Sequence, residues 1–140
     1  MELSEVIANM IKGFNIIAGY SYNKAYAINT DADIDGLRQW TGPAQTANVW
    51  INYAFQSKAL NGFSLGVGGN YNSKTYISQS LQFGEFHIPA YTVLNAVAGY
   101  DTKRFRISFK LDNLTDKSYW GSYVNQMMPR RFSANFALRI

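Results

Sequence analysis

Three aspartates have the spacing of a metal-binding loop. Asp31, Asp33 and Asp35, with a glycine directly after them, match the opening of an EF-hand calcium loop, which takes carboxylate ligands from alternate positions. The twelfth position of such a loop is a bidentate Glu, but this chain has Gly42 there. We therefore interpret the segment as a turn-rich loop that binds a cation weakly at most, and we predict no metal site.

The other chemistry-bearing residues stand apart from one another. His87 is the single histidine and the chain has no cysteine, so the sequence offers neither a His/Cys metal site nor a thiol nucleophile. No Ser and Asp accompany His87 in the manner of a catalytic triad. The sequon Asn113, Leu114, Thr115 is interpreted as a turn at a strand end. We predict no catalytic residue and no cofactor, and we do not expect an enzyme.

The composition fits a single domain in which apolar and polar residues alternate. Of the 140 residues, 47% are apolar and 16% aromatic. The mean hydropathy is nevertheless −0.19, because Asn, Ser, Thr and Gly separate the apolar residues. No apolar run approaches the roughly 18 residues of a transmembrane helix. The net charge of +4 raises the question of nucleic acid, but Lys and Arg are scattered through predicted turns and loops, so we expect no nucleic-acid partner.

Six segments alternate with a period of two, which predicts strands, because helical spacing would scatter the same apolar residues around an axis. Segment by segment, the apolar sides carry Phe14, Ile16, Ala18, Tyr20 and Tyr22; Ala47, Val49, Ile51, Tyr53 and Phe55; Phe63, Leu65, Val67, Gly69 and Tyr71; Leu94, Ala96, Ala98 and Tyr100; Phe105, Ile107, Phe109 and Leu111; and Phe132, Ala134, Phe136, Leu138 and Ile140. The opposite sides carry mainly small polar residues and charges. Each strand is about ten residues long, the length that a tilted strand needs to cross a membrane.

Long and short connections take turns along the chain. We expect long ones at about 28–45, 76–90 and 116–130, short ones at Gln56–Asn61 and Asp101–Arg104, and a further strand stub at Met1–Ala8 joined by a turn at Asn9–Gly13. In an antiparallel meander, alternate connections lie at the same end, so all long loops share one end. Outer-membrane barrels have this asymmetry, with short periplasmic turns and longer extracellular loops.

A soluble β-sandwich or lipocalin-like barrel would also have alternating strands. The membrane interpretation is favoured because the apolar faces stay apolar on every strand, while the opposite faces suit a hydrated lumen. On this interpretation, Arg in place of Ile51 or Val67 costs about 2–4 kcal/mol near the membrane midplane, whereas Arg at Asn52 or Gly68 costs less.

Residues 111–120 (LDNLTDKSYW) resemble a stretch that TonB-dependent receptors, especially the ferric-siderophore branch, carry before their final hairpin. These receptors then have Pro-Arg and an alternating terminal strand, as in Pro129, Arg130 and the residues up to Ile140. Further matches, in the order of the family, lie at Lys12–Ile16 with Gly19–Tyr22, at Thr46–Tyr53, and at Tyr91–Val93 with Ala98–Tyr100. The resemblance covers nearly the whole chain.

The resemblance implies an all-β fold, with residues 1–140 as an antiparallel meander of six or seven strands of a transmembrane β-barrel. Complete receptors of this kind resemble 22-stranded barrels closed by a plug. The chain is therefore expected to be the C-terminal portion, without the plug domain and the N-terminal strands. Met1–Glu5 lacks the features of a secretory signal, which predicts a mature or truncated product or a protein that is not exported. Six or seven strands alone would leave two unpaired edges in lipid, so we do not expect the chain to be stable there by itself.

One departure concerns the end of the sequence, where Ile140 stands in place of the aromatic residue, usually Phe, that the barrel-assembly machinery reads in this family. The resemblance implies a receptor of the bacterial outer membrane for TonB-dependent uptake of ferric siderophores or a similar nutrient. Its expected partners are outer-membrane lipid, the ferric siderophore, TonB through the N-terminal region, and the barrel-assembly machinery.

Ferric siderophores are bulky and often anionic, so loop aromatics and cations are the predicted ligand-facing residues. They are Arg38, Trp40, Lys74, Tyr76, Lys117, Tyr119, Trp120 and Tyr123. Two alternatives stay open at this point: a small structural or adhesive β-barrel without a transport role, and a soluble β-domain that binds a hydrophobic ligand.

Overall fold

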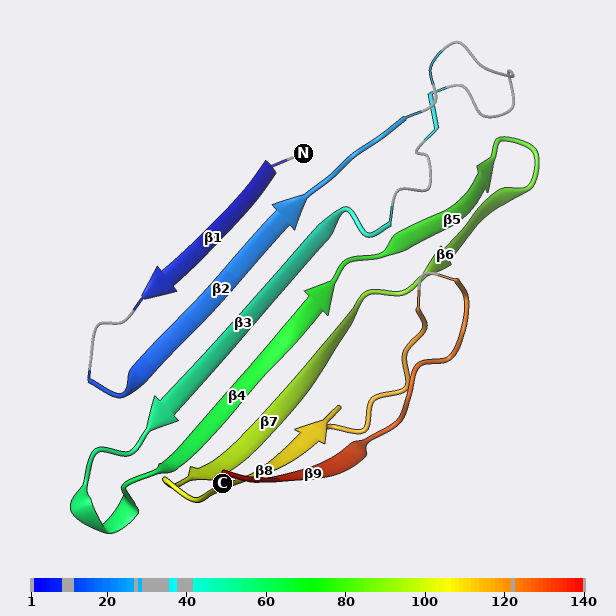
Figure 1. Cartoon of the computed structure of the whole chain (residues 1–140). Helices are drawn as coiled ribbons and strands as arrows, with labels where there is room; N and C mark the ends of the chain where they lie inside the picture. Colours follow the sequence, from blue (N-terminus) through cyan, green and yellow to red (C-terminus); the bar gives the residue numbers. More distant parts are fainter. Residues whose placement is uncertain are drawn as a thin grey trace.

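The structure, a computed structural model, describes residues 2–8, 12–26, 28, 36–37, 42–121 and 123–139. Its main element is a seven-stranded antiparallel sheet in which the strands follow one another in chain order, apart from one inserted hairpin (Figure 1). The strands are β1 (Glu2–Ala8), β2 (Phe14–Tyr22), β3 (Gln45–Ala54), β4 (Phe63–Asn72), β7 (Tyr91–Asp101), β8 (Phe105–Asp112) and β9 (Arg131–Leu138). The predicted all-β meander is confirmed, and the predicted stub is its first strand.

Short turns and long connections lie at opposite ends of the sheet, as predicted (Figure 1). The short turn between β3 and β4 contains one 3-10 helix, Lys58–Leu60. The predicted connection over 76–90 is more ordered than the sequence indicates, because it folds into the hairpin of β5 (Thr75–Ser80) and β6 (Gly84–Ile88). This hairpin extends beyond the main sheet at the long-loop end (Figure 1). Within the described residues, no helix is long and apolar enough to cross a membrane.

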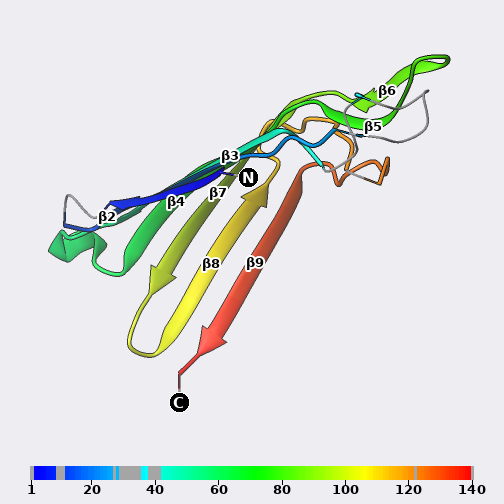
Figure 2. The same cartoon turned by 90° about the horizontal axis from the view of Figure 1, so that it is seen from above.

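The strand register places the predicted apolar sides on one continuous face. One row of this face crosses six strands through Ile16, Ile51, Val67, Ala96, Leu111 and Phe132. The face is open, with Val67 47% and Phe132 70% exposed. The described part of the chain forms a single curved layer with no second sheet over this face (Figure 2). A soluble sandwich would bury these residues between two sheets, so the arrangement is that of a lipid-facing wall.

The polar face is shaped by a tryptophan that covers two glycines. A Cβ added at Gly68 would meet Cε3 of Trp50 at 2.2 Å, and one added at Gly66 would meet Cζ2 of the same ring at 2.9 Å. A cross-strand aromatic ring of this kind supplies the packing that glycine lacks. A side chain at Gly68 must displace the Trp50 ring, a cost that its lumen-facing position does not include, so the statement that Arg at Gly68 costs less than Arg at Ile51 or Val67 stays a prediction.

Candidate ligand-binding site

The polar face is hollowed at the long-loop end of β4, β7, β8 and β9, and the hollow has a volume of about 410 Å³. It opens where the strands meet the segment between β8 and β9. Its polar and aromatic lining consists of Asn70, Asn72, Tyr91, Asn95, Asp112, Asn113, Tyr119 and Arg131. Amides, phenol rings and an ion pair therefore face one space, the combination by which pockets orient a ligand.

Asn113 fixes the segment that closes this hollow. The residue directly follows β8, is 2% exposed, and has a φ of 52°, a left-handed conformation that Asn adopts more readily than most residues. Its backbone N–H donates to Oδ1 of Asn95 at 3.0 Å. Its side-chain Nδ2 donates to the carbonyl of Lys117 at 2.9 Å, while its Oδ1 accepts from the N–H of Lys117 at 2.9 Å. The amide thus replaces the backbone partners that a tight turn would leave unpaired.

A second clamp draws the far end of the same segment back to its start. Oδ1 of Asp116 accepts a hydrogen bond from the N–H of Arg130 at 2.7 Å, and the N–H of Met127 donates to the carbonyl of Tyr119 at 3.0 Å. Tyr119 consequently meets Tyr91 at the start of β7, with 4.7 Å between ring centroids and 38° between planes. Residues 111–120, which carried the family resemblance, therefore build one wall of the hollow.

The electrostatics of the hollow come from one carboxylate between two cations. Oδ1 of Asp112 lies 2.8 Å from Nζ of Lys110, and its Oδ2 lies 3.0 Å from Nη2 of Arg131. The Asp112 side chain is 20% exposed, whereas those of Lys110 and Arg131 are 47% and 57% exposed. Two cations balanced by one carboxylate leave one positive charge, which favours an anionic ligand at this end of the lumen.

A similar group lies on the same face at the short-turn end. Oδ2 of Asp101 accepts hydrogen bonds from Nε of Arg106 at 2.8 Å and from Nη2 of Arg139 at 3.2 Å. Nη1 of Arg139 also donates to the carbonyl of Thr102 at 2.8 Å. These bonds tie the turn between β7 and β8 to the end of β9.

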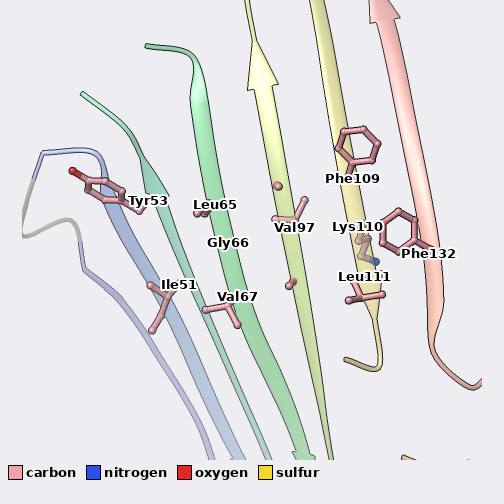
Figure 3. A pocket seen from close by; sticks show the side chains of 12 residues that line it. Ile51, Tyr53, Leu65, Gly66, Val67, Val97, Phe109, Lys110, Leu111 and Phe132 are labelled. Carbon is pink, nitrogen blue, oxygen red and sulfur yellow. The ribbon is translucent and has the colours of Figure 1, made fainter. Parts of the chain in front are cut away.

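A second hollow, of about 530 Å³, lies on the apolar face (Figure 3). It forms because Ala96 and Ala98 of β7 are small, while Val67 of β4 and Phe109 of β8 rise on either side. Its lining is apolar apart from Tyr53 and Lys110. We assign this hollow to the lipid-facing surface, because a ligand site needs several convergent polar groups.

The profile of the family described as "TonB dependent receptor-like, beta-barrel" matches residues 2–114. The chain belongs to this family. Among curated proteins, the chain is similar to the ferrichrome outer membrane transporter/phage receptor of Escherichia coli K12, with 29% identity over 86% of this chain and 16% of that protein. It is also similar to the ferrioxamine B receptor of Salmonella typhimurium SL1344, with 28% identity over 82% of this chain and 17% of that protein. The chain thus spans about a sixth of the length of these relatives.

Solved structures show the same fold. The pyoverdine outer membrane receptor FpvA of Pseudomonas aeruginosa PAO1, bound to pyoverdine, superposes with a TM-score of 0.75 and 21% identity over 99% of this chain and 21% of that one. The siderophore receptor PiuA of Acinetobacter baumannii gives a TM-score of 0.71 and 22% identity over 94% of this chain and 20% of that one. The family profile and this shared fold together make the meander part of a TonB-dependent receptor β-barrel, and the soluble and purely structural alternatives are not favoured.

The structure of this TonB-dependent barrel segment places one predicted ligand-facing residue, Tyr119, in the lining of the polar hollow. Lys117, Trp120 and Tyr123 lie in the same segment but outside that lining, and Tyr123 is 85% exposed. The predicted residues Arg38 and Trp40, and the acidic run Asp31, Asp33 and Asp35, lie outside the described residues.

The two other predicted residues, Lys74 and Tyr76, lie at the base of the β5–β6 hairpin. Nζ of Lys74 is 2.7 Å from Oε1 of Glu85 and 4.7 Å from the ring centroid of Tyr76. The hydrogen bond to Glu85 is the main cause that raises the pKa of Lys74 above its ordinary value. His87 is close by, with Nδ1 3.6 Å from the same Glu85 oxygen. No group of three metal-binding side chains occurs among the residues described.

Sequence reasoning missed Tyr91, the lumen amides and the Asp112 group. One signal for the Asp112 group was available in the sequence: the polar side of a single predicted strand carries Arg106, Lys110 and Asp112. The partnership with Arg131 depends on the register of β8 against β9, in which Asp112 and Arg131 are paired. The meeting of Tyr91 with Tyr119 depends on the fold of an irregular segment, which strand periodicity does not report.

Proposed function

We propose that the chain forms the C-terminal wall of an outer-membrane receptor for TonB-dependent uptake of ferric siderophores or a similar nutrient. The observation that supports this most directly is the polar hollow at the long-loop end, where paired tyrosines, amides and a cation-rich ion group face the lumen. A bulky anionic iron complex needs flat apolar contact, hydrogen-bond donors and positive charge together. The names of the relatives, a ferrichrome transporter and a ferrioxamine B receptor, agree with a ferric siderophore as the ligand.

Within this proposal, different residues of the hollow make different contacts with the ligand. The rings of Tyr91 and Tyr119 offer the contact surface, and Arg131 supplies the positive field. Asn70 and Asn95 orient the ligand through their amides. The exposed loop residues Lys117, Trp120 and Tyr123, and the hairpin residues Lys74 and Tyr76, are proposed to meet the ligand first, because they extend beyond the strands.

The remaining partners belong to the same proposal. Strands elsewhere in the barrel would pair with the outer edges of β1 and β9, since an open edge in lipid leaves backbone groups unpaired. TonB would engage an N-terminal region of the receptor, and the barrel-assembly machinery would insert it into the membrane. The family is one of transport receptors, and we propose no enzymatic role for this protein.

The test is ligand binding by the complete receptor that carries this sequence. Titration with ferrichrome and with a ferric catecholate gives the dissociation constants for two siderophore classes. Tyr119→Ala is expected to raise the Kd for the recognised complex about fivefold to tenfold, equivalent to about 1.0–1.4 kcal/mol. Tyr100→Ala is the matched control, because Tyr100 lies on the apolar face at the opposite end of the same strand as Tyr91.

Two results would overturn the proposal. One is a complete receptor that neither binds any ferric siderophore nor supports growth on one under iron limitation. The other is an equal loss of affinity in Tyr100→Ala and Tyr119→Ala, which would place the ligand away from the hollow.

A further inference from the structure

The two ends of the sheet differ in net charge. The described residues of the short-turn end include six cations against the single carboxylate of Asp101; the cations are Lys12, Lys58, Lys103, Arg104, Arg106 and Arg139. With its strand ends included, the long-loop end has seven cations against seven carboxylates in the sequence; these are Lys24, Arg38, Lys74, Lys110, Lys117, Arg130 and Arg131 against Glu2, Asp31, Asp33, Asp35, Glu85, Asp112 and Asp116. The first end therefore carries five net positive charges and the second carries none.

Four of the six cations have no acidic neighbour at their own end within the described part of the chain. Arg106 and Arg139 both bind Asp101. Lys12, Lys58, Lys103 and Arg104 are exposed, and they are distributed over all three short turns. A row of cations spread over successive turns forms a rim, and among the described residues of this end Asp101 alone offsets its charge.

The turn between β7 and β8 presents its two cations at its tip. The N–H of Thr102 donates to the carbonyl of Phe105 at 2.8 Å, and Oγ1 of Thr102 accepts from the N–H of Phe105 at 3.0 Å. These bonds close the turn across Lys103 and Arg104. The backbone carbonyl of Arg104 also accepts from the N–H of Arg139 at 2.8 Å, so the tip is held from two sides.

An aromatic belt lies directly behind the rim on the apolar face. Adjacent ring centroids are 6.5 Å apart for Phe14 and Tyr53, 5.0 Å for Tyr53 and Phe55, and 5.4 Å for Phe55 and Phe63. The belt continues across the Phe63–Tyr100 cross-strand pair to Phe105, 6.1 Å from Tyr100, and on to Phe136, 6.3 Å from Phe105. Aromatic belts mark the depth of the membrane–water interface.

The belt fixes the height of the cations relative to the membrane. In outer-membrane barrels, girdles of aromatic residues lie at the two membrane interfaces, so turns that follow the belt by a few residues lie at the level of the headgroups. In the 3-10 helix Lys58–Leu60, Leu60 is 45% exposed beside the cation of Lys58. An exposed leucine next to a lysine suits the same boundary, because the lysine stem can lie along apolar surface while its ammonium stays in water.

We propose that this short-turn rim binds the phosphate groups of anionic phospholipids in the adjacent membrane leaflet. Cations near an anionic surface are attracted to it, and the effect is lost within a Debye length, so both the charge and the height of the rim matter. This binding site depends on the chain being a membrane wall, and it does not depend on which ligand the receptor transports. Ligand uptake and lipid binding can therefore fail independently.

The experiment compares two matched double variants of the complete receptor in detergent micelles. The first, Lys103→Gln with Arg104→Gln, removes two cations of the rim. The second, Lys24→Gln with Arg130→Gln, removes two cations at the long-loop end. Each protein is titrated with dioleoyl-phosphatidylglycerol and with dioleoyl-phosphatidylcholine, and the bound lipids are counted by native mass spectrometry. Retention of the folded form during heat-dependent electrophoresis controls for misfolding.

The unmodified receptor is expected to bind phosphatidylglycerol in preference to phosphatidylcholine. The rim variant should lose about fivefold of that preference per cation removed, whereas the long-loop variant should keep it. Equal binding of the two lipids by the unmodified receptor would overturn the proposal, and so would an equal loss in the two variants. If the rim variant misfolds, Lys58→Gln in the separate turn between β3 and β4 provides the same test with one cation.

Discussion

The polar faces of β2–β4 and of β8–β9 line the same wall but are ordered in different ways. Strands β2, β3 and β4 contain no charged residue, and their polar face is set by the fit of Trp50 over Gly66 and Gly68. Strands β8 and β9 contain Arg106, Lys110, Asp112 and Arg131, and their face is set by ion pairs. An added methyl group should lower the stability of the sterically fitted region, whereas added salt should weaken the partly exposed ion pairs of the charged region. The two regions should therefore be destabilised by different changes.

The largest effect is expected where the uncharged region meets lipid. Val67→Arg places a cation in the middle of the apolar row between Ile51 and Ala96. The cost should be about 2–4 kcal/mol if the site lies near the midplane. Asn52→Arg, one row away on the polar face, should cost less than about 1 kcal/mol. Urea unfolding of the complete receptor in liposomes measures both, and equal costs would contradict the assignment of the two faces.

A smaller effect is expected from one methyl group on the polar side of the same region. Gly68→Ala forces a Cβ against Trp50 and against the carbonyl of Val49, which would lie 2.5 Å away. Overpacking of this kind costs about 1–3 kcal/mol. Gly99→Ala is the control, because its nearest contact would be the rotatable hydroxyl of Ser64 at 3.1 Å.

Removing the Trp50 ring should partly restore the stability that Gly68→Ala loses. The double variant Gly68→Ala with Trp50→Ala should cost less than the sum of the two single variants, because the clash with the ring disappears while the one with the carbonyl of Val49 remains. Strict additivity in the same unfolding assay would mean that Trp50 does not shape this face.

The smallest effect is expected in the charged region. Asp112→Asn keeps the shape of the side chain and removes the charge between Lys110 and Arg131. The pairs are partly exposed, so the cost should be less than about 1 kcal/mol and should shrink further at high salt. Unfolding at two salt concentrations tests this, and a cost that is large and independent of salt would indicate a sterically ordered region like β2–β4.

The strands could be predicted because period-two alternation is a local property. Phe105, Ile107, Phe109 and Leu111 share a face in any strand, whatever its neighbours are. The apolar sides also restrict the register, since a slip of one residue would turn a strand over, but they do not distinguish slips of two residues. The meander and the grouping of the long loops at one end could therefore be predicted from the sequence.

The site was less accessible, because its groups meet only through the fold. The contact of Trp50 with Gly68 needs the β3–β4 pairing, and the prediction for Gly68 did not include it for that reason. The wall formed by Tyr119 needs the hydrogen bonds of Asn113, which a sequon-like pattern does not reveal. Arg38 and Trp40 stay predictions, since they lie outside the described residues.

The chain-order meander has a consequence for the speed of folding. Each strand of the main sheet pairs with its chain neighbour in that sheet, but paired residues lie well apart in sequence, as Phe14 and Tyr53 or Phe63 and Tyr100 do, so each pairing must first close a loop. The connection between β4 and β7 is shortened by the β5–β6 hairpin. Once that hairpin has formed, the loop that β4 and β7 must close contains fewer free residues and loses less entropy. The hairpin can therefore act as a local nucleus that brings β4 and β7 together.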